Sequence, residues 1–172
     1  MNSLLHRLVV AAALLGAVCF VGVEVMILYQ LGGQFLAYIP RSADEFAGYL
    51  MGASAFLALA YTFVADEHIR VTLVLDRVGP ATRRVLERFA ITLAAALAAY
   101  LAWHVSKMAW QSWQLDERSS GLIALPMRLP QAAMAFGATT FFLAVAERAW
   151  RVWHGESTQL ELVTGEVLRA DR

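Results

Sequence analysis

Four long apolar runs, separated by polar connections, constrain this chain more than any other feature of its sequence. They cover residues 8–31, 46–65, 85–110 and 129–150. Each run is long enough to cross a lipid bilayer, which takes an α-helix of about 20 residues. Because a backbone in lipid must satisfy its own hydrogen bonds, the runs predict an all-α integral membrane protein with four transmembrane helices.

The composition agrees with a helix bundle in a membrane. Of the 172 residues, 59% are hydrophobic and only 16% are charged, whereas an ordinary soluble domain has about 25% charged residues. The formal net charge of +0 argues against nucleic-acid binding. We expect one membrane domain over residues 1–154 and a short tail over residues 155–172. The single cysteine, Cys19, is interpreted as a small packing residue within the first run.

The first run has two alternative interpretations besides a membrane helix. A cleaved signal peptide has an apolar region of roughly 7–15 residues that ends at small residues, but this run continues past Gly22 to Tyr29. A lipoprotein anchor at Cys19 is also disfavoured, because Val18 stands where a small residue is usual. We therefore interpret the run as a membrane helix.

The second run is preceded by residues that favour the start of a helix. Ser42 and Glu45 predict a capping box, in which each side chain accepts a hydrogen bond from the backbone N–H of the other. Asp44 and Glu45 also suit the positive end of the helix dipole. Gly48 and Gly52 are four residues apart on one face and predict close approach of another helix, although glycine is common in membrane helices by chance.

A polar stretch over residues 66–84 connects the second and third runs. Its aliphatic residues recur at helical spacing with charged residues between them, which predicts a short amphipathic helix at the membrane surface. A solvated loop is the alternative. The aliphatic residues are Val71, Val74, Leu75 and Val78.

Lysine and arginine are distributed unevenly between the two sides of the predicted membrane domain. If the four spans alternate in direction, ten of the 14 cations lie on the side of the amino terminus. Cytoplasmic loops are enriched in these residues, so we expect both termini, the tail and the amphipathic helix on the cytoplasmic side. The four cations on the other side are Arg41, Lys107, Arg118 and Arg128.

Two polar features lie inside the apolar runs. Glu24 is in the first run, and His104 and Lys107 are in the third, which runs in the same direction. An unpartnered charge inside a membrane costs roughly 2.5–3.5 kcal/mol on insertion scales, so Glu24 requires a partner or a proton. Pairing with Lys107 or His104, or contact with another subunit, is favoured over a role as proton carrier.

The sequence contains no catalytic, cofactor or metal-binding pattern. The four histidines are dispersed among the amino-terminal head, the polar stretch, a helix and the tail, so they do not supply the paired ligands of a haem. Ser119 and Ser120 have no evident His and Asp partners that would make either a nucleophile. We therefore predict that the protein is not an enzyme and needs no cofactor or metal.

Three stretches resemble a known family. The acidic pair Asp44 and Glu45 lies in SADEFAGYLM, and SSGLIALPMRLP provides a Ser/Thr, small-residue and proline segment before the last helix. The stretch ALAYTFVADEHIRVTLVLD contains a His-x-Arg-Val motif with His68 and Arg70, but Thr72 replaces the aspartate common after the valine. Together these stretches resemble the small, DctQ-like permease subunit of tripartite ATP-independent periplasmic (TRAP) transporters.

This resemblance implies a subunit of the bacterial inner membrane that acts with a large multi-helix permease, a periplasmic solute-binding protein and membrane lipids. The family takes up organic acids, such as dicarboxylates, 2-oxo acids or acidic sugars, with an ion gradient, usually of sodium. The large subunit is expected to carry the substrate and ion sites while the small one braces it. The residues expected in structural or subunit contacts are Glu24, Asp44, Glu45, Gly48, Gly52, His68, Arg70 and Lys107.

A self-sufficient, proton-coupled multidrug exporter is the main alternative function. Such a protein would dimerise and use Glu24 to bind protons and cationic drugs in turn, which fits a single carboxylate in the first helix. The long connections and the His-x-Arg-Val motif disfavour it. A structural partner of an unrelated membrane complex is a third possibility.

Overall fold

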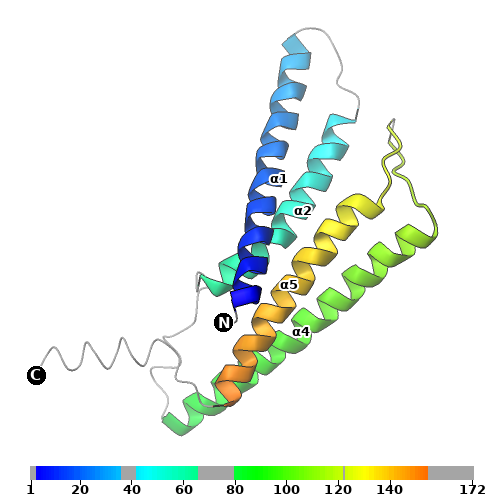
Figure 1. The fold of residues 1–172 in the computed structure, drawn as a ribbon. Coiled ribbons are helices and arrows are strands. Elements are labelled where there is room, and N and C mark those ends of the chain that lie inside the picture. Colours follow the sequence, from blue (N-terminus) through cyan, green and yellow to red (C-terminus); the bar gives the residue numbers. More distant parts are fainter. Residues whose placement is uncertain (1–2, 36–41, 66–79, 122, 155–172) are drawn as a thin grey trace, which may run out of the picture.

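The computed structural model describes residues 3–35, 42–65, 80–121 and 123–154. These residues form four long helices, which Figure 1 shows as α1 (Ser3–Phe35), α2 (Ala43–Val64), α4 (Pro80–Gln114) and α5 (Arg128–Trp153). All four are long and apolar enough to cross a membrane. The predicted fold class, an all-α membrane protein with four transmembrane helices, is therefore confirmed.

Three of the helices extend beyond both ends of the apolar runs that predicted them. α1 continues to Phe35 through Gly32 and Gly33, beyond the predicted end of the run at residue 31, and α4 begins at Pro80 rather than near residue 85. A glycine inside a helix costs about 1 kcal/mol, but unpaired backbone groups in lipid cost several times as much, so the helix persists. Pro130 lies in the first turn of α5, where a proline is tolerated because its missing N–H would have no partner inside the helix.

Two predicted segments fall outside the described residues. Most of the expected amphipathic surface helix, together with His68 and Arg70, lies within residues 66–79. The expected tail is residues 155–172. Both remain predictions.

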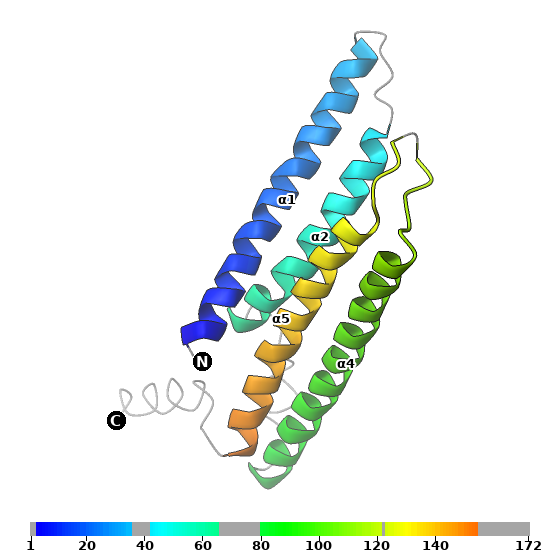
Figure 2. The ribbon, with the colours of Figure 1, turned by 45° about the vertical axis from the view of Figure 1, so that its right-hand side comes forward.

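The four helices lie in a row in the order α1, α2, α5, α4, as both ribbon views show (Figures 1 and 2). α2 packs against α1 and α5, α4 packs against α5, and α1 makes a lesser contact with α5. The start of α1 and the end of α5 lie toward the same end of the row (Figure 1). Because the row does not close into a ring, α1 and α4 are edges with free surfaces.

Mostly small residues form the packing interface between α1 and α2, called here the first seam of the row. Ala12, Ala53 and Leu57 form a buried cluster, and Cys19 packs against it as predicted. A Cβ atom added at Gly16 would lie 3.2 Å from the Cβ of Leu57. Side chains of this size let two helix backbones approach closely without a water-driven hydrophobic force.

In the second seam, between α2 and α5, the backbone at one glycine lies close against the backbone of the neighbouring helix. A Cβ atom added at Gly137 would lie 2.5 Å from the backbone carbonyl carbon of Phe56 and 2.7 Å from the backbone nitrogen of Leu57. By contrast, a Cβ at Gly52 would lie 3.7 Å from the Met134 sulfur, and one at Gly48 would meet nothing within 4 Å. Within this chain, Gly137 therefore makes the close approach that we predicted for Gly48 and Gly52.

Candidate subunit-contact sites

A short hairpin, residues 115–127, connects α4 to α5 (Figure 1). We call the end of the four helices at which it lies, measured along the helix axes, the hairpin end. The Ser119 N–H donates to the Leu125 carbonyl, and the Met127 N–H donates to the Glu117 carbonyl, both at 2.9 Å. These bonds give the hairpin a fixed shape, which the turn-prone composition of this segment alone did not predict.

The Glu45 carboxylate ties this hairpin to the start of α2. The hydroxyl groups of Tyr49, at 2.7 Å, and of Ser119 both donate to Glu45 Oε1. The Ser119 oxygen in turn accepts the N–H of Gly121 at 3.2 Å. A Cβ atom at Gly121 would overlap the Glu45 carboxylate, so the close contact requires glycine at that position. We call these four residues the Glu45 node.

The predicted capping box at the start of α2 is wrong. Ser42 has a left-handed backbone with φ of 67°, and its side chain makes no capping hydrogen bond. Its oxygen is buried without a partner among the described residues. The Glu45 side chain instead faces Ser119, 74 positions away in the sequence. The hydroxyl groups of Tyr49 and of the distant Ser119 therefore replace the predicted bond to Ser42, while Asp44 stays exposed.

The Glu45 node joins two of the three stretches that resemble the DctQ family. Glu45 and Tyr49 belong to SADEFAGYLM, and Ser119 and Gly121 belong to SSGLIALPMRLP. Sequence reasoning considered Ser119 only as a nucleophile, so it missed this role. The available signal was that both stretches were expected at the same end of the membrane domain.

Exposed charges surround the base of the hairpin. Asp116, which has a positive φ of 43°, lies 3.3 Å from Arg118 and 3.7 Å from Arg128. The Arg128 guanidinium also lies 5.5 Å from the centre of the Trp113 ring. Exposed ion pairs of this kind add little stability, but arginine and tryptophan suit the polar boundary of a membrane.

Contacts between arginine and aromatic side chains join neighbouring helices at the other end of the helix axes, called here the arginine-rich end. Arg88 on α4 lies 5.3 Å from the ring centre of Trp153 on α5, whose Nε1–H donates to Thr92 at 3.2 Å. Arg148 on α5 lies 5.9 Å from the ring centre of Phe63 on α2. These contacts combine packing with positive charge, as expected at a membrane boundary.

The expected pairing of Glu24 with Lys107 or His104 is not formed within the described part of the chain. Glu24 is exposed on α1, whereas Lys107 and His104 are exposed on α4. These helices are the two edges of the row, and α2 and α5 separate them (Figure 2). Similar direction in the membrane was therefore not enough to bring the charges together.

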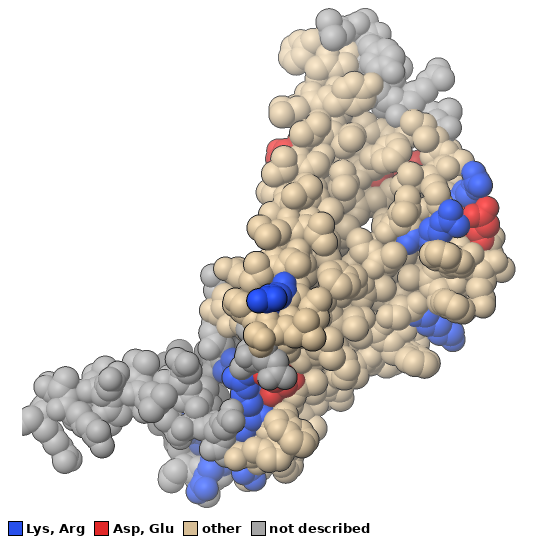
Figure 3. All heavy atoms as spheres, in the orientation of Figure 1, with Lys and Arg blue, Asp and Glu red and all other residues tan. Residues whose placement is uncertain are grey.

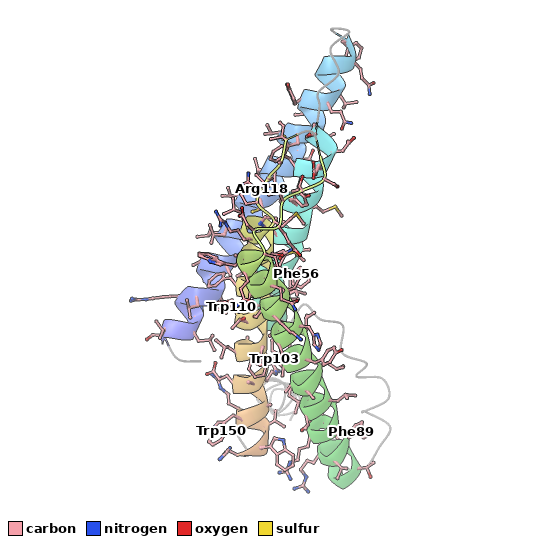
Figure 4. All side chains as sticks on the ribbon, turned by 90° about the vertical axis from the view of Figure 1, so that its right-hand side faces the viewer. Phe56, Phe89, Trp103, Trp110, Arg118 and Trp150 are labelled. Atoms are coloured by element: carbon pink, nitrogen blue, oxygen red, sulfur yellow. The ribbon has the colours of Figure 1, made fainter. Side chains whose placement is uncertain are left out.

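Lys107 lies on an aromatic outer face of α4. Figure 4 looks onto this helix and labels Trp103 and Trp110, which are 71% and 64% exposed. The ring of His104 lies 4.2 Å from that of Tyr100. A lysine between tryptophans near a helix end can extend its ammonium group to the membrane boundary. Across the residues described here, no three His, Cys, Asp or Glu side chains form a group that could hold a metal ion.

A comparison with protein families identifies the chain. The family model described as "Tripartite ATP-independent periplasmic transporters, DctQ component" matches residues 23–155, which is most of the sequence and includes the Glu45 node. No curated protein matches the sequence. DctQ proteins are transporter subunits rather than enzymes, and they act with a large permease and a periplasmic binding protein. The chain therefore belongs to the DctQ family and is the small, multi-pass inner-membrane component of a TRAP transporter.

Proposed function

We propose that this chain is a scaffold that braces the large permease during uptake of organic acids driven by an ion gradient. The observation that carries the proposal is the open row of helices. Within the most apolar window of each span, only 11–33% of the residues are buried inside the chain. A row with this much free apolar surface suits a role as a wall against which a larger helical protein lies.

The distribution of charge supports an orientation with both termini in the cytoplasm. Figure 3 shows several blue side chains with some red among them at the arginine-rich end, and a mixed group of blue and red side chains near the hairpin. By the positive-inside tendency, the arginine-rich end is cytoplasmic, and the hairpin and the Glu45 node are periplasmic. The described arginines of the arginine-rich end are Arg7, Arg83, Arg84, Arg88, Arg148 and Arg151.

Reconstitution in liposomes tests the proposal. The large permease, with and without this chain, is incorporated into liposomes and supplied with the binding protein outside. Uptake of radiolabelled dicarboxylates, 2-oxo acids and acidic sugars is then measured under an inward sodium gradient. We expect uptake of one of these classes only when the chain is present, and loss of that uptake when an ionophore removes the gradient.

Two results would contradict the proposal. Full uptake by the large permease without this chain would show that no brace is needed. Proton-driven export of cationic drugs by this chain alone would instead support the exporter alternative, in which Glu24 is the working carboxylate. The exposed position of Glu24 at an edge of the row does not favour that alternative.

A further inference from the structure

One exposed stripe of α1 contains a carboxylate among large apolar side chains. Its residues recur every three or four positions, so they share one side of the helix. The apolar members are 47–91% exposed, and Glu24 is exposed between them. We call the set the Glu24 stripe; it consists of Phe20, Glu24, Leu28, Leu31 and Phe35.

The packing of α1 against α2 places Glu24 inside the membrane-spanning part of the row. A Cβ atom at Gly22 would lie 3.0 Å from the side chain of Leu50. Because the two helices are antiparallel, Glu24 is then level with Gly48, five residues after the start of α2 at Ala43. At 1.5 Å per residue this is about 8 Å inside the end of α2.

Glu24 has no partner within the described part of the chain. It takes part in none of the hydrogen bonds or ion pairs formed there. Lys107 can reach the membrane boundary because its side chain is long, but a glutamate side chain is short. An exposed carboxylate at this depth therefore requires either a proton or a donor from outside the described part of the chain.

We propose that the Glu24 stripe docks onto a transmembrane helix of the large permease that presents a lysine or arginine side chain opposite Glu24. The apolar residues on both sides of the carboxylate suit a helix in the bilayer, and charge complementarity requires a cation at the depth of Glu24. The inference rests on the proposed bracing role, since it names the surface through which the bracing acts.

A second copy of this chain fits the stripe less well. Lys107, the cation nearest the hairpin end of α4, is exposed on the other edge of the row. Pairing it with Glu24 of another copy would join opposite edges, which is a heterologous contact that continues from copy to copy unless the rotation closes a ring. The large permease, which is already a component of the transporter, provides a single partner.

Photocrosslinking in the intact complex tests the position of the stripe. A photoreactive amino acid is placed at Phe20 in the full-length chain, which is co-expressed with the large permease. Val18 is the matched control because it is 68% exposed, against 59% for Phe20, and points about 160° away around the helix. We expect the crosslink to the large permease to be at least about tenfold stronger from position 20 than from position 18.

Charge variants test the partner's chemistry through recovery of the large permease on the tagged chain. We expect Glu24→Lys to lower the recovery at least about tenfold, because two cations would face each other. Glu24→Gln keeps a hydrogen-bonding group and should lower it less than about threefold. Lys107→Glu, on the opposite edge, should leave the recovery unchanged.

The outcomes separate this inference from the proposed function. If the unmodified chain recovers no large permease, both are overturned. If it recovers the permease but position 20 crosslinks no better than position 18, or crosslinks to a second copy, only the stripe is wrong. Full recovery with Glu24→Lys would exclude a cationic partner, and the crosslink remains decisive if this variant does not insert.

Discussion

The two middle helices of the row are short and packed, whereas the two edge helices are long and mostly uncovered. α2 and α5 have 22 and 26 residues, and α1 and α4 have 33 and 35. The buried share of the most apolar window is 22% and 33% in the middle but 17% and 11% at the edges. The chain therefore determines the positions of its middle helices largely by itself, while its edges depend on lipid or a partner.

Helix length has a further consequence at the edges. At 1.5 Å per residue, α1 and α4 are roughly 50 Å long, against about 30 Å for the hydrocarbon core of a bilayer. Such helices must tilt or extend beyond the hydrocarbon. Because packing sets the tilt of a membrane helix, we expect the α2–α5 seam and the Glu45 node to influence the tilt of α1 and α4.

The largest predicted effect comes from a variant that disrupts packing between the two middle helices. Gly137→Ala would place a methyl group 2.5 Å from the Phe56 backbone, which cannot move without shifting α2. We expect a loss of about 1–3 kcal/mol in the free energy of unfolding, measured by thermal unfolding in mild detergent. Gly32→Ala on α1 is the matched edge variant.

Gly32→Ala is expected to raise the free energy of unfolding, whereas Gly137→Ala lowers it. A Cβ at Gly32 would meet nothing within 4 Å, and alanine favours a helix over glycine by up to about 1 kcal/mol. Gly52→Ala, with 3.7 Å to a flexible methionine, should lie between the two. Equal effects at positions 32 and 137 would mean that the middle is no more tightly packed than the edges.

A second prediction concerns the Glu45 node, which links a middle helix to the hairpin. Glu45→Gln and Ser119→Ala should each lower the free energy of unfolding, because each weakens the charge-assisted hydrogen bond between the two side chains. Since the two residues share that bond, the double variant should lose less than the sum, as a double-mutant cycle would measure. Hydrogen exchange of residues 117–125 should also become faster.

Asp44→Asn is the control for that prediction. Asp44 lies beside Glu45 at the same positive helix end but is exposed, so its loss removes only a dipole interaction of about 0.3–1 kcal/mol. Two results together would contradict the prediction: a loss in the free energy of unfolding for Glu45→Gln no larger than for Asp44→Asn, and additive effects of the Glu45 and Ser119 variants. They would mean that the acidic pair only stabilises the start of the helix.

The smallest predicted effect is at the start of α2. Ser42→Gly should raise the free energy of unfolding by about 0.5–1 kcal/mol, because glycine adopts a left-handed backbone more readily than serine does. Ser42→Ala should change little, since the serine side chain makes no capping bond. If Ser42→Ala instead lowers the free energy of unfolding by about 1 kcal/mol in the same thermal unfolding assay, the serine side chain does cap the helix and this prediction is wrong.

Sequence patterns predicted the local features of the fold well. The apolar runs predicted all four helices, and the small packing role of Cys19 was also correct. Gly32 and Gly33 misled the prediction of the end of α1, because the demand for paired backbone groups near lipid outweighs the low helix propensity of glycine.

The candidate contact residues were predicted less well, because each depends on which helices become neighbours. Glu45 was expected to bond to Ser42 but bonds to Ser119, and Glu24 was expected near Lys107 but lies on the opposite edge. Gly137 lies close against the backbone of α2, and no pair pattern marked it.

The sequence by itself determined that the chain crosses a membrane four times as helices, because apolar length and backbone hydrogen bonding are local properties that each segment satisfies alone. Only the tertiary structure decided the order α1, α2, α5, α4 in the row. That order brings a carboxylate on α2 to a hairpin 74 positions away and leaves Glu24 on an edge. Contacts between distant segments depend on helix order and register, which the apolar pattern of any one segment does not specify.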